Sequence, residues 1–175
     1  LVTIFSFITY RCGYLLINQR VGYIAVIIII SNLYLIELIS GRQELEHNDI
    51  AFLTYISLSI WSLIEYQYSN KKVWIYLIGI FSGMAILCKW LVGLVVYAGW
   101  FILKLIKKES IFKFKNKDFI ISLIITIIIA APWQILTFMW YPTEIKEVYK
   151  INALHFILPI EGHSGDIWYH LNKFN

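Results

Sequence analysis

A run of polar side chains interrupts two long apolar segments in the first third of the chain. It reads GRQELEHNDIAF, residues 41–52, and it contains a guanidinium, an imidazole, an amide and a carboxylate at Arg42, His47, Asn48 and Asp49. A carboxylate at a membrane surface can position or deprotonate an acceptor, and a guanidinium can bind a phosphate. The alternative is a solvated loop in which Asn48 or Asp49 caps the next helix, since both residue types are good N-caps. The two interpretations are compatible.

Lys89 is a second candidate, between the apolar runs IGIFSGMAILC and LVGLVVYAGWFIL. An ionisable residue inside an apolar stretch is costly in lipid and often functional. The alternative is an interfacial lysine whose ammonium reaches water while Trp90 sits in the aromatic belt. Glu65, an acid within another apolar run, is interpreted as a helix-packing residue.

The C-terminal sequence EGHSGDIWYH holds a third polar group, with His163, Asp166 and His170. Zinc sites usually have closer ligand spacing and a clear third or fourth ligand, so we expect no metal site and no cofactor. A polar external loop is the simplest interpretation of this sequence. A role for His163 in shaping a substrate pocket is the functional alternative.

The elements that position these side chains are expected to span a membrane. The chain is 59% hydrophobic and 15% charged, with a mean hydropathy of +0.70, whereas soluble domains have about 25% charged residues. We predict an all-α integral membrane protein, because helices satisfy their own backbone in lipid and no period-two alternation indicates a barrel. The net charge of +4 follows the expected topology, so nucleic acid is not an expected partner.

Spans of about 20 apolar residues are expected in six places: 1–10 (the tail of one), 21–40, 50–67, 73–88, 90–106 and 119–140. Residues 1–141 would form the helix bundle, with a kink at Pro132, which removes a backbone donor. Residues 142–175 would form an external region that begins with an interfacial amphipathic helix, for which Pro142 suits the first turn. The chain is expected to be an internal piece of a longer protein.

Orientation follows from the distribution of lysine and arginine. Three alternate loops, at 11–20, 68–73 and 104–118, carry ten of the fifteen basic residues. The positive-inside rule therefore predicts that these loops are cytoplasmic. The opposite, external face would hold all four histidines and most of the acids, so groups suited to chemistry gather there.

The order of these motifs resembles the polytopic GT-C fold glycosyltransferases of the protein O-mannosyltransferase and lipid A aminoarabinose transferase group. The resemblance rests on four stretches in the family's order: GRQELEHNDIAFLTY, GIFSGMAILCKWLVG, AAPWQIL and EGHSGDIWYHL. It implies a membrane enzyme that moves a sugar from a polyprenyl-phosphate donor to an acceptor on the external or periplasmic face, with inversion. Membrane lipid, the lipid-linked donor and the acceptor (a protein, lipid or glycan) are the implied partners.

The resemblance also implies roles for individual residues. Asp49 becomes the catalytic candidate, and the substrate-binding candidates are Arg42, His47, Asn48, Lys89 and His163. The sequence departs from the family in reading HND where an acidic pair is commoner. The family's main acid would lie upstream of Leu1, so residues 1–175 alone are expected to be inactive.

An alternative from another class is a non-enzymatic membrane protein, either a transporter or a subunit of an envelope complex. Transporters bind their substrates near the bilayer midplane, on broken helices. Here the polar groups crowd one face and the centres of the spans are almost free of charge, which favours chemistry at the interface.

Overall fold

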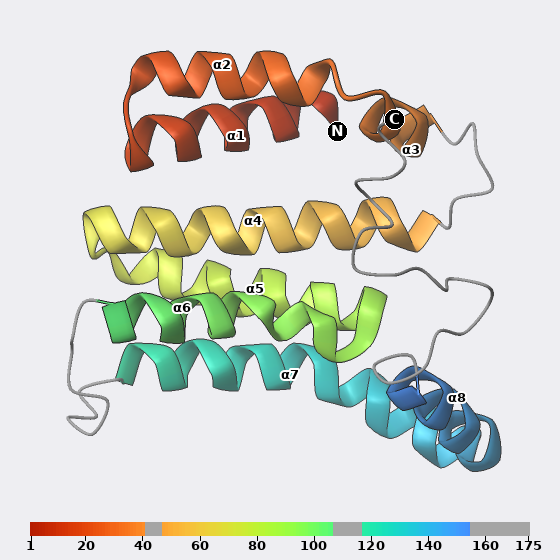
Figure 1. The fold of residues 1–175 in the computed structure, drawn as a ribbon. Helices are drawn as coiled ribbons and strands as arrows, with labels where there is room; N and C mark the ends of the chain where they lie inside the picture. Colours follow the sequence, from red (N-terminus) through yellow and green to blue (C-terminus); the bar gives the residue numbers. More distant parts are fainter. Residues whose placement is uncertain (41–46, 107–116, 155–175) are drawn as a thin grey trace. The chain divides into compact units, whose positions relative to one another are not determined.

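The computed structural model describes residues 1–40, 47–106 and 117–154. These residues form helices and no strand, which confirms the all-α prediction. The chain divides into two compact units, Leu1–Pro132 and Trp133–Asn175. The helices, labelled in Figure 1, are α1 (Val2–Leu16), α2 (Gln19–Ile30), α3 (Leu33–Ser40), α4 (His47–Ser69), α5 (Lys72–Lys89), the 3-10 helix η1 (Trp90–Leu94), α6 (Val95–Ile106), α7 (Lys117–Trp140) and α8 (Pro142–Leu154).

The first unit buries small polar side chains and exposes large apolar ones. Five hydroxyl residues are almost fully buried: Ser59, Ser62, Ser82, Ser122 and Thr126. Isoleucine side chains that are more than half exposed include Ile27, Ile28, Ile127 and Ile128. This is the reverse of a soluble domain, and it suits a bundle whose outer surface contacts lipid and whose helices are joined by hydroxyls. The chain is therefore a multi-pass membrane protein.

Fewer helices than expected have the length and apolar composition of a full span. Among the described residues two stretches qualify, Lys72–Ile106 and Lys117–Trp140, with a third if α2 and α3, bent by 58° at their junction, count as one. The bend divides the predicted span 21–40, because Asn32 Oδ1 accepts a hydrogen bond from Leu35 N at 3.0 Å and starts a new helix. The predicted span 50–67 is the middle of α4, a helix that carries two acids and several hydroxyls.

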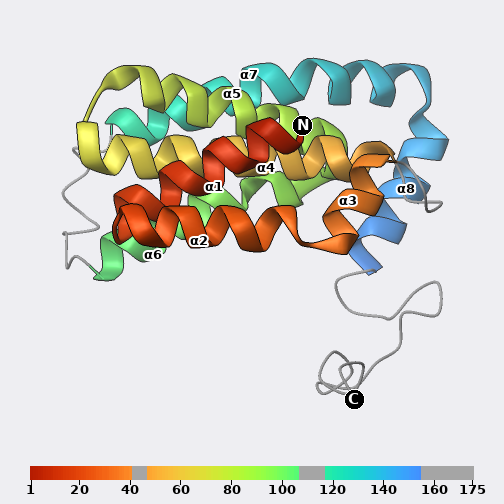
Figure 2. The same ribbon diagram turned by 90° about the horizontal axis from the view of Figure 1, so that it is seen from above.

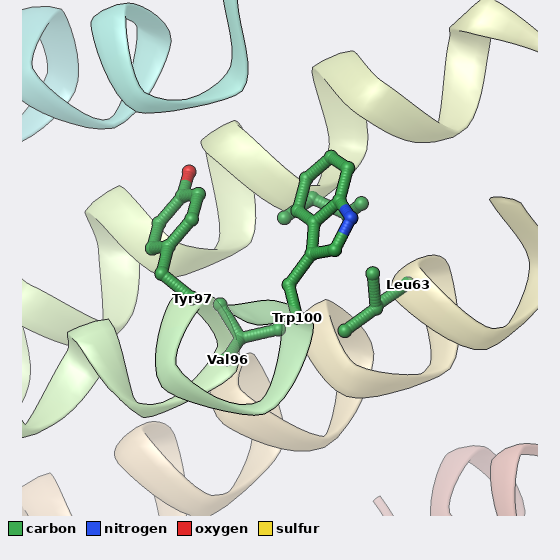
Figure 3. Packing of buried hydrophobic residues seen from close by; sticks show 5 residues of the cluster. Leu63, Val96, Tyr97 and Trp100 are labelled. Carbon is green, nitrogen blue, oxygen red and sulfur yellow. The ribbon is translucent and has the colours of Figure 1, made fainter. Parts of the chain in front are cut away.

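The stretch Lys72–Ile106 turns back on itself at η1 (Figure 1). A Cβ atom on Gly93 would lie only 2.6 Å from the backbone nitrogen of Ile86, so η1 lies directly against α5. Beyond the turn, α6 packs on α4 and α5 through the buried side chains of Leu63, Ile78, Val96, Tyr97 and Trp100, four of which are labelled in Figure 3. The predicted spans 73–88 and 90–106 are thus two arms of one hairpin.

A second hairpin, α1 and α2, corrects the predicted loop at 11–20 (Figures 1 and 2). Only Ile17 and Asn18 separate the two helices. The Asn18 side chain accepts a hydrogen bond at 3.0 Å from a backbone N–H in the first turn of α2 and so caps that helix. A Cβ on Gly13 would lie 2.8 Å from Gly22 Cα, so the helices touch through glycines. Close packing lets both helices continue through residues whose polarity suggested a loop.

Buried hydroxyls and glycines join the helices in the middle of the first unit. Ser59 Oγ of α4 lies 2.8 Å from Ser82 Oγ of α5, and Tyr97 Oη of α6 lies 2.8 Å from Ser122 Oγ of α7. A Cβ on Gly79 would come within 2.6 Å of the Ser122 carbonyl oxygen, so α5 and α7 are in backbone contact there. Small residues and hydroxyls of this kind hold helices together in lipid.

The second unit contains the end of α7 and α8. Pro142 is the first residue of α8 and Glu144 lies in its first turn, so the described part of the predicted helix is confirmed. None of its residues is buried, although Tyr149 Oη donates a hydrogen bond to Gln134 Oε1 of α7. Pro132 lies inside α7, immediately before the boundary between the units. The kink at this proline and the interfacial location of α8 stay predictions.

Candidate functional site

Asp49 and Lys89 lie far apart in the sequence and form an ion pair in the structure. Lys89 Nζ is 2.5 Å from Asp49 Oδ1. The two residues meet because α4 and α5 pack antiparallel, as the contact between Ser59 and Ser82 further along the same helices shows. Asp49 and Lys89, which belong to two separate motifs of the sequence, therefore form one site.

The start of α4 positions the carboxylate. The helix begins at His47, so Asn48 and Asp49 lie within its first turn and the prediction that either of them is the N-cap is wrong. A carboxylate in the first turn lies near unpaired backbone N–H groups and the positive end of the helix dipole, which stabilises its charge. The Asn48 side chain is exposed at the same end of the helix.

The end of α5 positions the ammonium. Lys89 is the last residue of the helix, where a cation interacts favourably with the terminal carbonyl groups. The next residue, Trp90, has a φ of 48° and a ψ of −142°, a backbone conformation that residues with a side chain rarely adopt. Strain of this kind persists only where the surrounding structure enforces it. The turn therefore sets the direction in which the lysine leaves the helix.

The pair has capacity for a further ligand. Asp49 Oδ1 is buried and accepts no hydrogen bond of normal geometry from the described residues. Its short contact with the Lys89 ammonium is therefore an ion pair without the angles of a hydrogen bond. The Lys89 side chain is 40% exposed and that of Asp49 is 25% exposed. An ammonium has three donors, so Lys89 can donate to a further acceptor besides Asp49.

A small cavity lies near the start of α4, although neither Asp49 nor Lys89 lines it. It has a volume of about 260 Å³ and is lined by Leu1, Ile50, Ala51, Thr54 and Tyr55. The Thr54 hydroxyl already donates to the carbonyl oxygen of Ile50 at 2.7 Å, so its proton is not directed into the cavity. The walls are otherwise mainly apolar.

A second ion pair, which the sequence did not reveal, lies near the other end of α4. Arg11 Nε donates to Glu65 Oε1 at 2.5 Å, and Arg11 Nη2 donates to Glu65 Oε2 at 3.2 Å. Trp61 Nε1 donates to the same carboxylate at 3.2 Å, and the Glu65 side chain is only 6% exposed. Glu65 is thus a helix-packing residue, as expected. Its partner Arg11 was predicted to lie in the loop at 11–20, so the pair was not foreseen. The only sequence feature that could have suggested this pair is that one acid and one base each lie beside an apolar run.

Three of the other predicted site residues cannot be placed. Arg42 and His163 lie outside the described residues, and so does the side chain of His47. Their roles in substrate binding stay predictions. Within the parts of the chain that the structure describes, no three His, Cys, Asp or Glu side chains come together as metal ligands would.

The family model for dolichyl-phosphate-mannose-protein mannosyltransferases matches residues 1–136, which include both members of each ion pair. The chain belongs to this family. Membership confirms the resemblance drawn from the motifs and identifies a membrane glycosyltransferase at a general level. It gives no support to the transporter or envelope-subunit alternative. No curated protein and no solved structure matches the chain significantly.

Proposed function

We propose that this chain binds the phosphate of a polyprenyl-phosphate sugar at Lys89, with Asp49 beside the reacting groups, on the external face of the membrane. The observation that carries the proposal is the partly exposed ion pair at one end of the bundle, in which the buried Asp49 Oδ1 accepts no well-directed hydrogen bond. A prenyl chain has an apolar surface to follow, because the helices of the first unit present large aliphatic side chains outward. The phosphate at its end then reaches the ammonium at the interface.

The reaction is a displacement at the anomeric carbon. An acceptor hydroxyl, or a comparable nucleophile, loses its proton to a carboxylate and forms a bond to that carbon. The bond from the carbon to the phosphate oxygen breaks, and the polyprenyl phosphate leaves with the electron pair. Because the leaving group is already a phosphate, it needs stabilisation of negative charge more than a proton, and Lys89 supplies it. A single displacement inverts the anomeric centre.

The ion pair links donor binding to the carboxylate. Without a donor, the ammonium of Lys89 is engaged by Asp49. The phosphodiester of the donor, whose single negative charge is shared by two oxygens, competes for that ammonium, since charge-assisted hydrogen bonds to phosphate are strong. When the phosphate binds, Asp49 loses this contact and can accept a hydrogen bond or a proton from the acceptor. The carboxylate therefore becomes available only when the sugar donor is present.

Replacement of Lys89 by methionine in the full-length enzyme tests the proposal. Methionine keeps an unbranched apolar side chain and removes the charge. A charge-assisted hydrogen bond contributes roughly 1.5–3 kcal/mol, so we expect kcat/KM for the donor to fall about ten- to more than a hundredfold. If the lysine binds ground and transition states equally, only KM rises. If it stabilises the departing phosphate, kcat falls as well.

Lys72→Met is the matched control, because Lys72 is an exposed lysine at the opposite end of α5. We expect it to retain wild-type kinetics. Lys89→Arg should recover activity only in part, because a planar guanidinium does not replace a compact ammonium. A Lys89→Met enzyme that is folded, abundant and fully active would reduce this residue to a membrane anchor and would overturn the proposal.

A further inference from the structure

We propose that a second cavity, near the Arg11–Glu65 pair, binds the headgroup of an anionic phospholipid. The cavity has a volume of about 580 Å³, and its lining combines two cations, one acid and an apolar wall: Arg11, Lys71, Glu65, Phe7, Val73 and Trp74. A volume of this size is within the range of small-molecule sites, about 300–1,000 Å³. The inference does not depend on the proposed transferase mechanism.

The charge of the cavity favours an anion. The carboxylate of Glu65 already accepts hydrogen bonds from Arg11 and Trp61, so its charge is neutralised within the wall. Arg11 has five N–H donors, of which two are directed at Glu65, and its side chain is 36% exposed. Lys71 is exposed and forms no ion pair with any described residue. Two cations against one satisfied acid leave a net positive site with unused donors.

The apolar wall distinguishes a lipid from a soluble anion. Phe7 is 55% exposed and Val73 is 51% exposed, so both present apolar surface beside the cations. Phe7 packs edge to face on Trp61, and Trp61 packs in the same way on Trp74. Tryptophan rings of this kind settle at the level of lipid headgroups. A phosphodiester at Arg11 and Lys71 can therefore continue as acyl chains along this aromatic wall.

The position of the cavity along the helices agrees with this ligand. From Asp49 to Glu65 the distance along α4 is about 24 Å at 1.5 Å per residue, so the two ion pairs lie near opposite ends of the helix. Lys71 and Lys72, in one of the loops predicted to be cytoplasmic, lie just beyond the Glu65 end of α4. Anionic lipids are enriched in the cytoplasmic leaflet, and basic pockets between helices on that side bind their headgroups.

Thermal unfolding of the purified full-length protein in a neutral detergent tests the inference. We expect phosphatidylglycerol to raise the melting temperature saturably by about 3 °C or more. Phosphatidylcholine and inorganic phosphate, at the same concentrations, should each change it by less than about 1 °C. Equal protection by phosphatidylcholine would overturn the charge argument. Equal protection by inorganic phosphate would show a soluble-anion site and overturn the lipid.

Two neighbouring lysines provide a matched pair of variants. Lys71 lines the cavity and Lys72 does not, although both are exposed. We expect Lys71→Gln to raise the phosphatidylglycerol concentration at half-maximal protection about fivefold, and Lys72→Gln to leave it unchanged. Equal shifts for the two variants would show general attraction to a charged surface and would overturn the site.

Discussion

The two ends of α4 each carry an acid–base pair, and the pairs differ in how completely their charges are satisfied. At one end, Glu65 receives two hydrogen bonds from Arg11 and a third from Trp61 and is almost fully buried. At the other end, Asp49 has a single short contact with Lys89, and the lysine is 40% exposed. Both pairs join α4 to a neighbouring helix, so packing alone does not explain the difference.

The difference indicates separate roles for the two pairs. A buried charge is retained where its hydrogen bonds are complete, because an unpaired charge in a medium of low dielectric constant is costly. The bidentate geometry at Glu65 fixes α1 against α4. The open geometry at Asp49 leaves donors and acceptors that the proposed donor substrate would use, and a buried oxygen without a well-directed partner calls for an explanation of this kind.

Charge reversal at the open pair should have the largest effect. In Lys89→Asp, two carboxylates face each other, so we expect low abundance and loss of transfer activity. Adding Asp49→Lys restores an ion pair and should recover the melting temperature. Activity should remain at least about a hundredfold below wild type, because a carboxylate at position 89 repels the donor phosphate. Recovery of activity together with stability would show that the pair is purely structural.

Glu65→Gln should be the most destabilising of the neutral replacements at the two pairs. Removing one partner of a buried ion pair costs about 3–5 kcal/mol, and partial exposure of Arg11 reduces this to about 2–4 kcal/mol. Asp49→Asn should cost less, about 1 kcal/mol, because the Lys89 side chain that loses its partner is 40% exposed and can be solvated by water. Reversible unfolding of the full-length protein in detergent measures both values. Equal losses would contradict the comparison between the two ends.

Gly93→Ala should have a smaller effect, restricted to the Asp49 end. The new methyl group would meet the backbone of Ile86 at 2.6 Å, so η1 must shift and move Lys89 with it. We expect a loss of about 1–3 kcal/mol in stability and a several-fold rise in donor KM, with unchanged phosphatidylglycerol protection. Gly99→Ala is the control, because no atom beyond its chain neighbours and the backbone of its own helix lies within 4 Å of its added carbon. Wild-type donor KM in Gly93→Ala would show that the turn does not position the lysine.

The helical segments, and Asp49 and Lys89 as separate candidate residues, could be predicted because their signals are local. Apolar runs gave the helical segments, and a lone lysine and an acidic cluster stood out against lipid-facing sequence. The contact between Asp49 and Lys89 could not be predicted, since it depends on the antiparallel packing of α4 against α5. That packing is set by buried contacts such as Ser59 with Ser82, which carry no distinctive signal in one sequence.

Two predicted helix boundaries were wrong because a local hydrogen bond or a close helix contact decided them, and the hydropathy of the sequence did not. The sequence SN at 31–32 contains a helix-capping asparagine that divides an otherwise continuous apolar run. The basic residues around Gly13 suggested a loop, but glycine contacts with α2 let α1 continue to Leu16. In both places the decisive interaction involves a backbone group, which hydropathy does not register.

The Arg11–Glu65 pair has a consequence for how the protein is inserted into the membrane during synthesis. A charged residue at the centre of a span opposes insertion by the translocon by about 2.5–3.5 kcal/mol, and by less near the ends. Glu65 lies near the end of α4, a helix that does not qualify as a span on its own composition. Because α1 is synthesised first, its arginine is present when α4 emerges. We therefore expect α4 to enter the bilayer efficiently only as the partner of α1.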